Sequence, residues 1–378
     1  MNLRLMMLLV LAAGSSLLAS TCCKNNSVQS QLGCINSEIQ QILNKVIDIH
    51  VIQNDGCHLN IVHIKQVDIP YTIFESGHYC LQEDVIAAGA NAITITASNV
   101  TLDLNGFHIT GGTNGITSSG TDVKIFNGTV QGATTSGIAI TGGTNIVIDN
   151  VVARTNGADG FFSSGGSTVQ FNNVEATQNG ADGFHLTVSN YDLNHVVANQ
   201  NLGGGVFATG NALTIHTSHF EQNEEGGIFL GSLTNFCIEN STIQRNTGNG
   251  IEVTGTSNTG LLFNNCITSN TAIGIILADA TEYVEIIQNK VIGNGPLVVS
   301  TAGIDIGGGT WLNSSPAGGI ATTHAVFANF SQHNGTTPGT AAATDTNYSQ
   351  NLKALTTTFG ELRTTLGTGI GRLENITL

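Results

Sequence analysis

The chain has 378 residues, of which 47 are glycine, only 10% are charged and 40% are hydrophobic. Its net charge of −15 excludes the basic stripe that nucleic-acid binding requires and disfavours docking on anionic lipid. The glycine-rich, weakly charged composition favours many short strands joined by tight turns, around a core long enough to bury the apolar residues.

Residues 1–21 have the pattern of a signal peptide: Arg4 supplies the positive charge, residues 5–13 are apolar, and residues 18–21 are small enough for cleavage. We therefore expect the mature protein to be secreted, periplasmic or attached to the cell surface. Lipidation of Cys22 is an open alternative. No later stretch approaches 18 consecutive apolar residues, so no membrane span is expected after cleavage.

Five of the seven cysteines precede the repeats described below, and an exported chain meets oxidising conditions. We expect Cys57 and Cys80 to form a disulfide across the N-terminal part of the fold. The odd total leaves a free or lipidated thiol. The spacings fit no zinc signature.

Both ends carry short apolar heptads, in residues 35–49 and 352–366. We assign residues 22–68 to an N-terminal helical or cap segment and residues 348–378 to a C-terminal helix. Two interpretations of these heptads stay open. The helices cap the ends of a repeat array, or they assemble the chain into a homo-oligomer.

A repeat of 22 to 24 residues occupies the middle of the chain. A glycine followed by an aliphatic or aromatic residue recurs in this rhythm, and an asparagine keeps the same interval four residues before most of these glycines. The glycines of the repeat are Gly115, Gly137, Gly160, Gly183, Gly205, Gly227, Gly250 and Gly274, with a stretched copy at Gly303. Two turn markers that share one register over so many copies indicate a repeat architecture.

Each repeat contains three short segments in which apolar and polar residues alternate, as expected of strands with one face inward. The sequence therefore predicts an all-β fold, a right-handed solenoid of three parallel sheets over residues 69–310. Residues 311–347 are the expected linker and last irregular coil. We expect Ile138, Phe161, Phe184 and Val206 to stack in one inward column. The asparagines should bond turn backbone between coils, and the glycines should allow positive φ at turns.

Upstream of the regular repeats, residues 77–81, 92–95 and 100–106 begin the same pattern. Here the chain resembles the right-handed parallel β-helix repeat proteins of the pectin-lyase-like superfamily, over roughly residues 69–310. The resemblance implies the fold and leaves the activity open, because that superfamily holds lyases, hydrolases, epimerases, tailspikes and adhesins. The signature motifs of pectate lyases, polygalacturonases and alginate epimerases are missing from this sequence.

Two residues after each repeat glycine the side chain should point outward. Four successive positions of this column carry rings, namely Phe162, His185, Phe207 and Phe229. Outward positions are normally polar, so these residues predict either a ligand-binding platform about 15 Å long, at roughly 4.8 Å per coil, or a face covered by a terminal segment.

Asp159 and Asp182 precede their glycines in two matching Asn-Gly-Ala-Asp-Gly-Phe runs. On adjacent coils their carboxylates should lie about 5 Å apart, a spacing that suits a retaining glycosidase pair or a shared Ca²⁺. Asp-Gly is equally an ordinary turn dipeptide. His185 is expected close to both carboxylates and completes the set of candidate catalytic residues.

Three functions are compatible with the sequence. The first is a secreted or cell-surface repeat protein that binds polysaccharides, cell-surface glycans or other surface partners. The second is a polysaccharide lyase or glycoside hydrolase. The third is a structural spacer or adhesin shaft. The outward rings argue against this function, because a shaft does not need exposed aromatic side chains.

Overall fold

The computed structural model describes residues 61–187, 190–254, 259–277 and 284–295, with the strands at 304–306, 325–327 and 330–332. The chain divides into two compact units, Met1–Ile61 and Val62–Leu378, and every described strand belongs to the second. The expected signal peptide, the two heptad segments and Cys57 lie outside the described residues.

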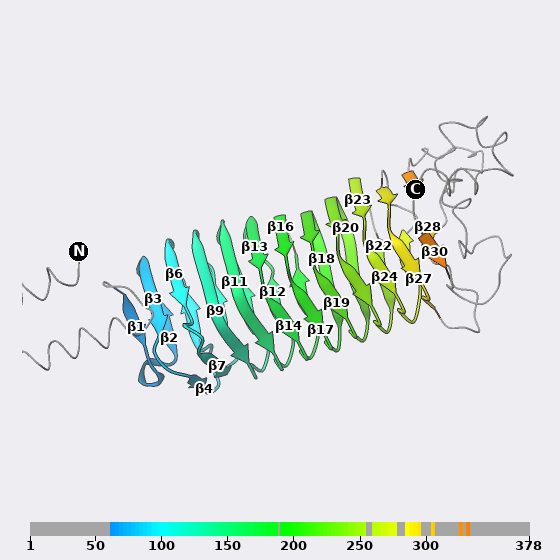
Figure 1. Ribbon diagram of the computed structural model, residues 1–378. Helices are drawn as coiled ribbons and strands as arrows, with labels where there is room; N and C mark the ends of the chain where they lie inside the picture. Colours follow the sequence, from blue (N-terminus) through cyan, green and yellow to red (C-terminus); the bar gives the residue numbers. More distant parts are fainter. Residues whose placement is uncertain are drawn as a thin grey trace, which may run out of the picture. The chain divides into compact units, whose positions relative to one another are not determined.

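The second unit is a solenoid of parallel strands that stack coil upon coil (Figure 1). Equivalent strands of successive coils pair in register and form three sheets. The first sheet contains β2 (Tyr71–Ile73), β5 (Ile93–Ile95), β8 (Ile116–Ser118), β10 (Ile138–Ile140), β12 (Phe161–Ser163), β15 (Phe184–Leu186), β22 (Asn249–Thr254), β25 (Ile275–Leu277) and β28 (Ile304–Ile306).

The second sheet contains β1 (Val62–Ile64), β3 (Gly77–Leu81), β6 (Val100–Asp103), β13 (Thr168–Asn172), β16 (Asn190–Asn194), β23 (Thr259–Phe263), β26 (Val284–Ile287) and β29 (Ala325–Phe327). The third contains β4 (Val85–Ala87), β7 (His108–Gly111), β14 (Glu175–Thr177), β17 (Val197–Asn199), β19 (His219–Glu221), β21 (Thr242–Gln244), β24 (Cys266–Thr268), β27 (Lys290–Ile292) and β30 (Phe330–Gln332).

Four longer strands turn a corner and contribute to two sheets each. β9 (Val123–Gln131) and β11 (Ile146–Arg154) run from the second sheet into the third. β18 (Gly204–His216) and β20 (Gly226–Glu239) run from the first sheet into the second. The one helix in the described part of the chain is a 3-10 turn, Gln66–Asp68.

The core consists of apolar side chains stacked like upon like along the solenoid. The predicted inward column is confirmed, because Ile138 pairs with Phe161, Phe161 with Phe184, and Phe184 with Val206, and all four are buried. The rings of Phe161 and Phe184 stack with centroids 5.0 Å apart, and Phe171 packs edge-on against both. Such a column buries one large apolar side chain per coil, which is how a solenoid builds a continuous core.

The predicted asparagine ladder is also confirmed. Asn156, Asn179, Asn201, Asn223, Asn246, Asn270 and Asn294 are at most 2% exposed. From Asn156 to Asn270, each Nδ2 donates to the Oδ1 of the next asparagine at 2.8 to 3.0 Å, and each backbone N–H donates to the same oxygen. The ladder thereby satisfies buried polar groups at one corner of the coil.

The repeat glycines serve a different purpose from the one expected. Gly137, Gly160 and Gly183 do not have positive φ. A Cβ on Gly160 would lie 2.8 Å from both Asn179 Nδ2 and Gly183 O. Glycine is therefore required because the ladder asparagine of the next coil occupies the space, and this contact explains why the two sequence columns share a register. At this corner of the coil, positive φ is found instead at the residues immediately before the ladder asparagines: Thr155, Gln178, Gln200, Gln222, Arg245 and Ser269.

Three strands lie outside residues 69–310, the range expected for the solenoid. Strand β1 begins at Val62, within the expected N-terminal segment, and β29 and β30 lie within the expected linker and last irregular coil. Cys80 is disulfide-bonded with its partner outside the described residues, whereas Cys237 and Cys266 are free thiols. In the part of the chain that the structure describes, no helix is long and apolar enough to span a membrane.

Candidate functional site

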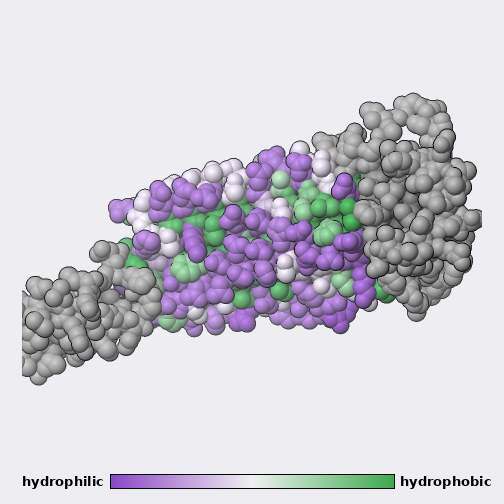
Figure 2. All heavy atoms as spheres, turned by 45° about the horizontal axis from the view of Figure 1, so that its top comes forward, coloured by the Kyte–Doolittle hydropathy of each residue, from purple (hydrophilic) through white to green (hydrophobic). Residues whose placement is uncertain are grey.

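The four predicted rings lie on the outer face of the first sheet, one per coil. Phe162 pairs with His185, His185 with Phe207, and Phe207 with Phe229, in strands β12, β15, β18 and β20. We call this row the ring ladder. All four residues are half-buried, so no described segment covers the ladder completely. On the face that Figure 2 shows, the surface of the described coils is mostly hydrophilic, with hydrophobic patches between the polar residues.

The rings stack upon one another along the solenoid. Centroids of His185 and Phe207 are 4.6 Å apart with an interplanar angle of 21°, and those of Phe207 and Phe229 are 5.2 Å apart with an angle of 5°. Phe162 is tilted by 32° against His185 at 5.5 Å. His185, Phe207 and Phe229 therefore turn their ring faces toward one another. A ligand lying along the ladder meets mainly ring edges, which carry partial positive charge.

Asp159 and Asp182 lie at equivalent positions of adjacent coils, just before strands β12 and β15. Asp159 Oδ1 accepts the backbone N–H of Asp182 at 3.1 Å, and Asp182 Oδ1 accepts that of Gly204 at 2.7 Å. In other coils, Asn114 and Asn249 accept the N–H groups of Ser136 and Ile273 in the same manner. Both aspartates thus perform a turn function that asparagine performs elsewhere.

The structure brings Asp159, Asp182 and His185 together. One ligand atom from each lies within 4.8 Å of the others. His185 Nδ1 donates to Asp182 Oδ2 at 2.9 Å, and the His185 side chain remains 30% exposed. Asp159 is only 7% exposed. The triad consequently combines one buried carboxyl group with a half-buried imidazole that a second carboxylate orients.

The environment changes the proton affinity of two members of this triad. Burial raises the pKa of the Asp159 carboxyl above its ordinary value of 3.8, although the nearby His185 opposes the change. The hydrogen bond to Asp182 raises the pKa of His185 above 6.5, against the opposing effect of burial. A buried carboxyl group and a hydrogen-bonded imidazole are the groups from which general acid–base chemistry is built.

Next to the triad lies a hollow of about 200 Å³ on the outer surface of the first sheet. Its lining includes Asp182, Gly204, Phe207, Glu225, Phe229 and Glu252. We call it the acidic hollow. It continues the Asp159–Asp182 column into coils where Gly204 and Gly226 replace a side chain, and it runs beside the last two rings of the ladder. Glu225, Asn249 and the two glycines were not among the site residues predicted from the sequence. The Gly-Gly pairs at 204–205 and 226–227, which replace Asp-Gly, were the available signal.

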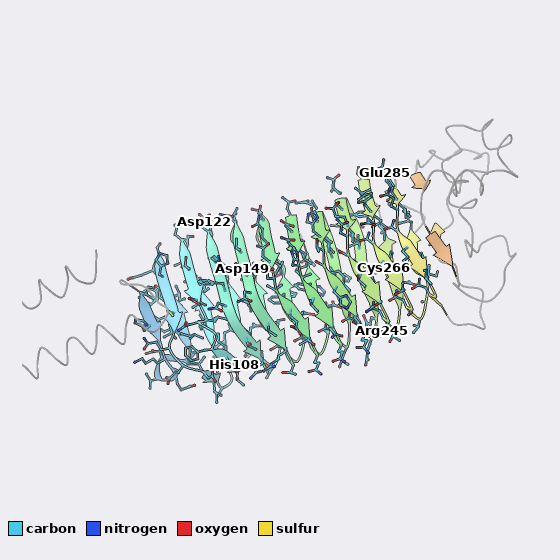
Figure 3. All side chains as sticks on the ribbon, viewed as in Figure 1. His108, Asp122, Asp149, Arg245, Cys266 and Glu285 are labelled. Carbon is cyan, nitrogen blue, oxygen red and sulfur yellow. The ribbon has the colours of Figure 1, made fainter. Side chains whose placement is uncertain are left out.

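Basic residues are absent from the described strands of the first sheet. The five described lysines and arginines are Lys65, Lys124, Arg154, Arg245 and Lys290. Lys124 pairs with Asp149 at 3.4 Å on the second sheet, and Arg245 pairs with Glu221 beside the third. Asp149 and Arg245 are labelled in Figure 3. The ring ladder and the acidic hollow therefore form a face that repels polyanions.

Comparisons with known proteins found several similar structures and one matching family. Among solved structures, the A-module of the mannuronan C-5 epimerase AlgE4 from Azotobacter vinelandii is 16% identical, with a TM-score of 0.45 over 72% of this chain and 84% of that chain. Pectate lyase Pel9A is 16% identical, with a TM-score of 0.39 over 67% and 75%. The Dettilon tailspike protein is 16% identical, with a TM-score of 0.38 over 75% and 60%. No curated protein sequence matches the chain.

The model of one protein family, described as the right handed beta helix region, matches residues 48–200 and 180–317. These overlapping matches cover more than half of the chain and coincide with the stacked strands. They confirm the right-handed parallel β-helix that the repeat and the resemblance to pectin-lyase-like proteins led us to expect. The chain therefore belongs to the right-handed β-helix family.

Proposed function

We propose that the protein binds glycans along the outer face of the first sheet, as a secreted or cell-surface β-helix. The observation that carries this proposal is the ring ladder, four half-buried rings on an outward column, with the acidic hollow beside it. Sugars present apolar C–H groups and many hydroxyl groups. An apolar row flanked by carboxylate and amide acceptors complements both.

The alternatives to glycan binding make different demands on this face. A plain structural shaft gains nothing from half-exposed rings, since outward positions of a solenoid are polar where they serve only solubility. A terminal segment lying over the ladder would explain the rings without a ligand. In that case, removing the rings would lower the stability of the protein and leave no binding activity to lose.

A glycan array probed with the wild-type protein and with Phe207→Ala/Phe229→Ala tests the proposal. Phe126→Ala is the matched control, because Phe126 is also half-buried and pairs within the second sheet, where the Lys124 ammonium lies 4.9 Å from its ring. We expect the wild type and the control to bind the same glycans on the array, and the double variant not to bind them. The proposal would be contradicted if the wild type bound no glycan, or if all three proteins bound the same glycans equally well.

Glycoside hydrolysis is the second candidate, and the Asp159–Asp182–His185 triad favours it. Carboxylates about 5 Å apart are the arrangement of retaining glycosidases, and a buried carboxyl with a raised pKa suits the general acid. An assay for reducing ends, together with one for the unsaturated ends that a lyase would release, distinguishes the two reactions. If Asp182→Asn keeps full activity on every glycan that the wild type degrades, the triad has no catalytic role.

A further inference from the structure

The acidic hollow exists because two coils lack a side chain that the neighbouring coils have. At the position occupied by Asp159, Asp182 and Asn249, the intervening coils have Gly204 and Gly226. The backbone does not require glycine at position 204, because φ there is not positive and an added Cβ would meet no atom closer than 3.5 Å. The missing side chain at Gly204 therefore leaves free space that the fold itself does not need.

Three carboxylates surround this space. Asp182 stands at one end, Glu252 at the other, and Glu225 is exposed at its side. Glu252 Oε2 accepts a hydrogen bond from Asn249 Nδ2 at 2.8 Å. In the part of the chain that the structure describes, no lysine or arginine pairs with any of the three. Asp182 is paired with His185 at 2.9 Å. Glu225 and Glu252 form no ion pair with any described residue, so the negative charge of these two glutamates is not neutralised within the described part of the chain.

Two rings of the ladder, Phe207 and Phe229, also line the acidic hollow. Phe229 stacks with one face on Phe207, while the next residue of the column on its other side is Glu252. Phe229 and Glu252 both line the acidic hollow, so a cation bound in the hollow reaches a carboxylate and an aromatic ring together. An alkylammonium group satisfies both partners, because it pairs with carboxylates and is attracted to ring faces.

We propose that the acidic hollow binds the protonated amino group of a glycan, so that the ligand is a polysaccharide containing non-acetylated amino sugars. This inference rests on the proposed glycan binding and specifies its ligand class. The volume of about 200 Å³ is below the roughly 300–1,000 Å³ of pockets that enclose whole small molecules. It suits one substituent of a ligand whose sugar chain continues along the ring ladder.

Calorimetry with a matched pair of ligands tests the inference on the intact protein. The glucosamine hexasaccharide and its fully N-acetylated counterpart share one backbone and differ in the ammonium groups. Lysine hexapeptide supplies the same charge without a sugar. At a pH where the amines are protonated and in physiological salt, which screens diffuse attraction to the acidic surface, we expect the glucosamine hexasaccharide to bind at least about tenfold more tightly than either of the others.

Two kinds of variant locate the binding. Gly204→Asn fills the hollow with the residue that the column carries at Asn249, at a position where an added Cβ meets no atom closer than 3.5 Å. Glu225→Gln/Glu252→Gln removes two charges from the hollow, and Glu175→Gln/Glu285→Gln removes two charges from the third and second sheets as a control. We expect the first two to weaken binding of the glucosamine hexasaccharide by about tenfold or more, and the control to change it less than about twofold.

The outcomes separate this inference from the proposal on which it rests. Equal binding of both hexasaccharides, or the same loss in the control as in the hollow variants, overturns the amino-group inference and leaves glycan binding standing. Binding of the lysine peptide as tight as that of the sugar overturns the glycan part of the inference. If no glycan binds in any form, the proposed function fails as well.

Discussion

Asp159 Oδ1 accepts the backbone N–H of Asp182 from the next coil at 3.1 Å, in a site where the Asp159 side chain is almost wholly buried. The same bond is made by neutral amides elsewhere in the column, as between Asn91 Oδ1 and the N–H of Asn114 at 3.1 Å. A carboxylate is thus not needed for the turn. Burying its charge costs stability, and the cost points to a role beyond the turn.

The first prediction follows from the raised pKa of Asp159. Because the folded state holds this proton more tightly than the unfolded chain, stability falls as the pH rises from about 3.8 through the folded-state pKa. Asparagine keeps the hydrogen bond and has no charge to bury. We therefore expect Asp159→Asn to melt at a higher temperature than the wild type at pH 8, with EDTA present.

The difference between the two melting temperatures should close as the pH falls below 3.8, the ordinary carboxyl value, since Asp159 is then protonated in both states. Thermal melts followed by circular dichroism across this pH range measure it. A variant that melts below the wild type at pH 8 would show that the Asp159 charge stabilises the native state.

The second prediction concerns calcium, for which Asp159 and Asp182 remain the candidate ligands. Two carboxylates within 4.8 Å of each other repel, and a bound cation relieves that repulsion. If Ca²⁺ binds there, it raises the melting temperature of the wild type in proportion to the logarithm of its concentration. We expect no such rise in Asp159→Asn/Asp182→Asn. A wild-type melting temperature that is independent of calcium would end the calcium hypothesis.

The third prediction concerns the asparagine ladder. Asn201 makes four hydrogen bonds while fully buried: its Nδ2 donates to Ala176 O and Asn223 Oδ1, and its Oδ1 accepts from the backbone and side chain of Asn179. Asn201→Ala leaves these partners unsatisfied, at about 1–3 kcal/mol each for those that water cannot reach. We expect a loss of about 3 kcal/mol in denaturant unfolding, against less than about 0.5 kcal/mol for the exposed neighbour in Leu202→Ala.

The fourth prediction contrasts Gly160, which directly precedes strand β12, with Gly204, the first residue of β18. Gly160→Ala places a methyl group 2.8 Å from Asn179 Nδ2 and Gly183 O, so we expect destabilisation of about 1–3 kcal/mol. Gly204→Ala meets nothing closer than 3.5 Å and should be neutral or stabilising by about 0.5 kcal/mol. Chemical denaturation measures both. Equal effects would mean that the close approach around Gly160 does not determine the residue type.

The sequence was sufficient to predict the architecture because each coil repeats one pattern. Once Gly137, Gly160 and Gly183 are aligned, the period-two alternation decides which side chains point inward, and strand pairing follows without knowledge of the rest of the chain. The ring ladder was predictable for the same reason. Residues such as His185 and Phe207 become neighbours simply because they are one period apart.

Other features depend on contacts that a sequence column does not reveal. A glycine is compatible with a positive φ and equally with a close approach, so the function of Gly160 required the position of Asn179. The acidic hollow is formed by missing side chains at Gly204 and Gly226 and by Glu225 and Glu252 from neighbouring coils. Likewise, the ring stacking that turns the faces of Phe207 toward its neighbours follows from side-chain angles rather than from residue identity.

The central claim, that a glycan binds on the ring ladder, is tested most directly by NMR of ¹³C-labelled phenylalanine rings during titration with a glycan retained on the array. Phe207→Ala, Phe229→Ala and Phe126→Ala assign the three signals of interest. The account predicts that the signals of Phe207 and Phe229 shift with ligand concentration along one saturable curve, while the signal of Phe126 stays in place. Saturable binding that leaves Phe207 and Phe229 unchanged would contradict it.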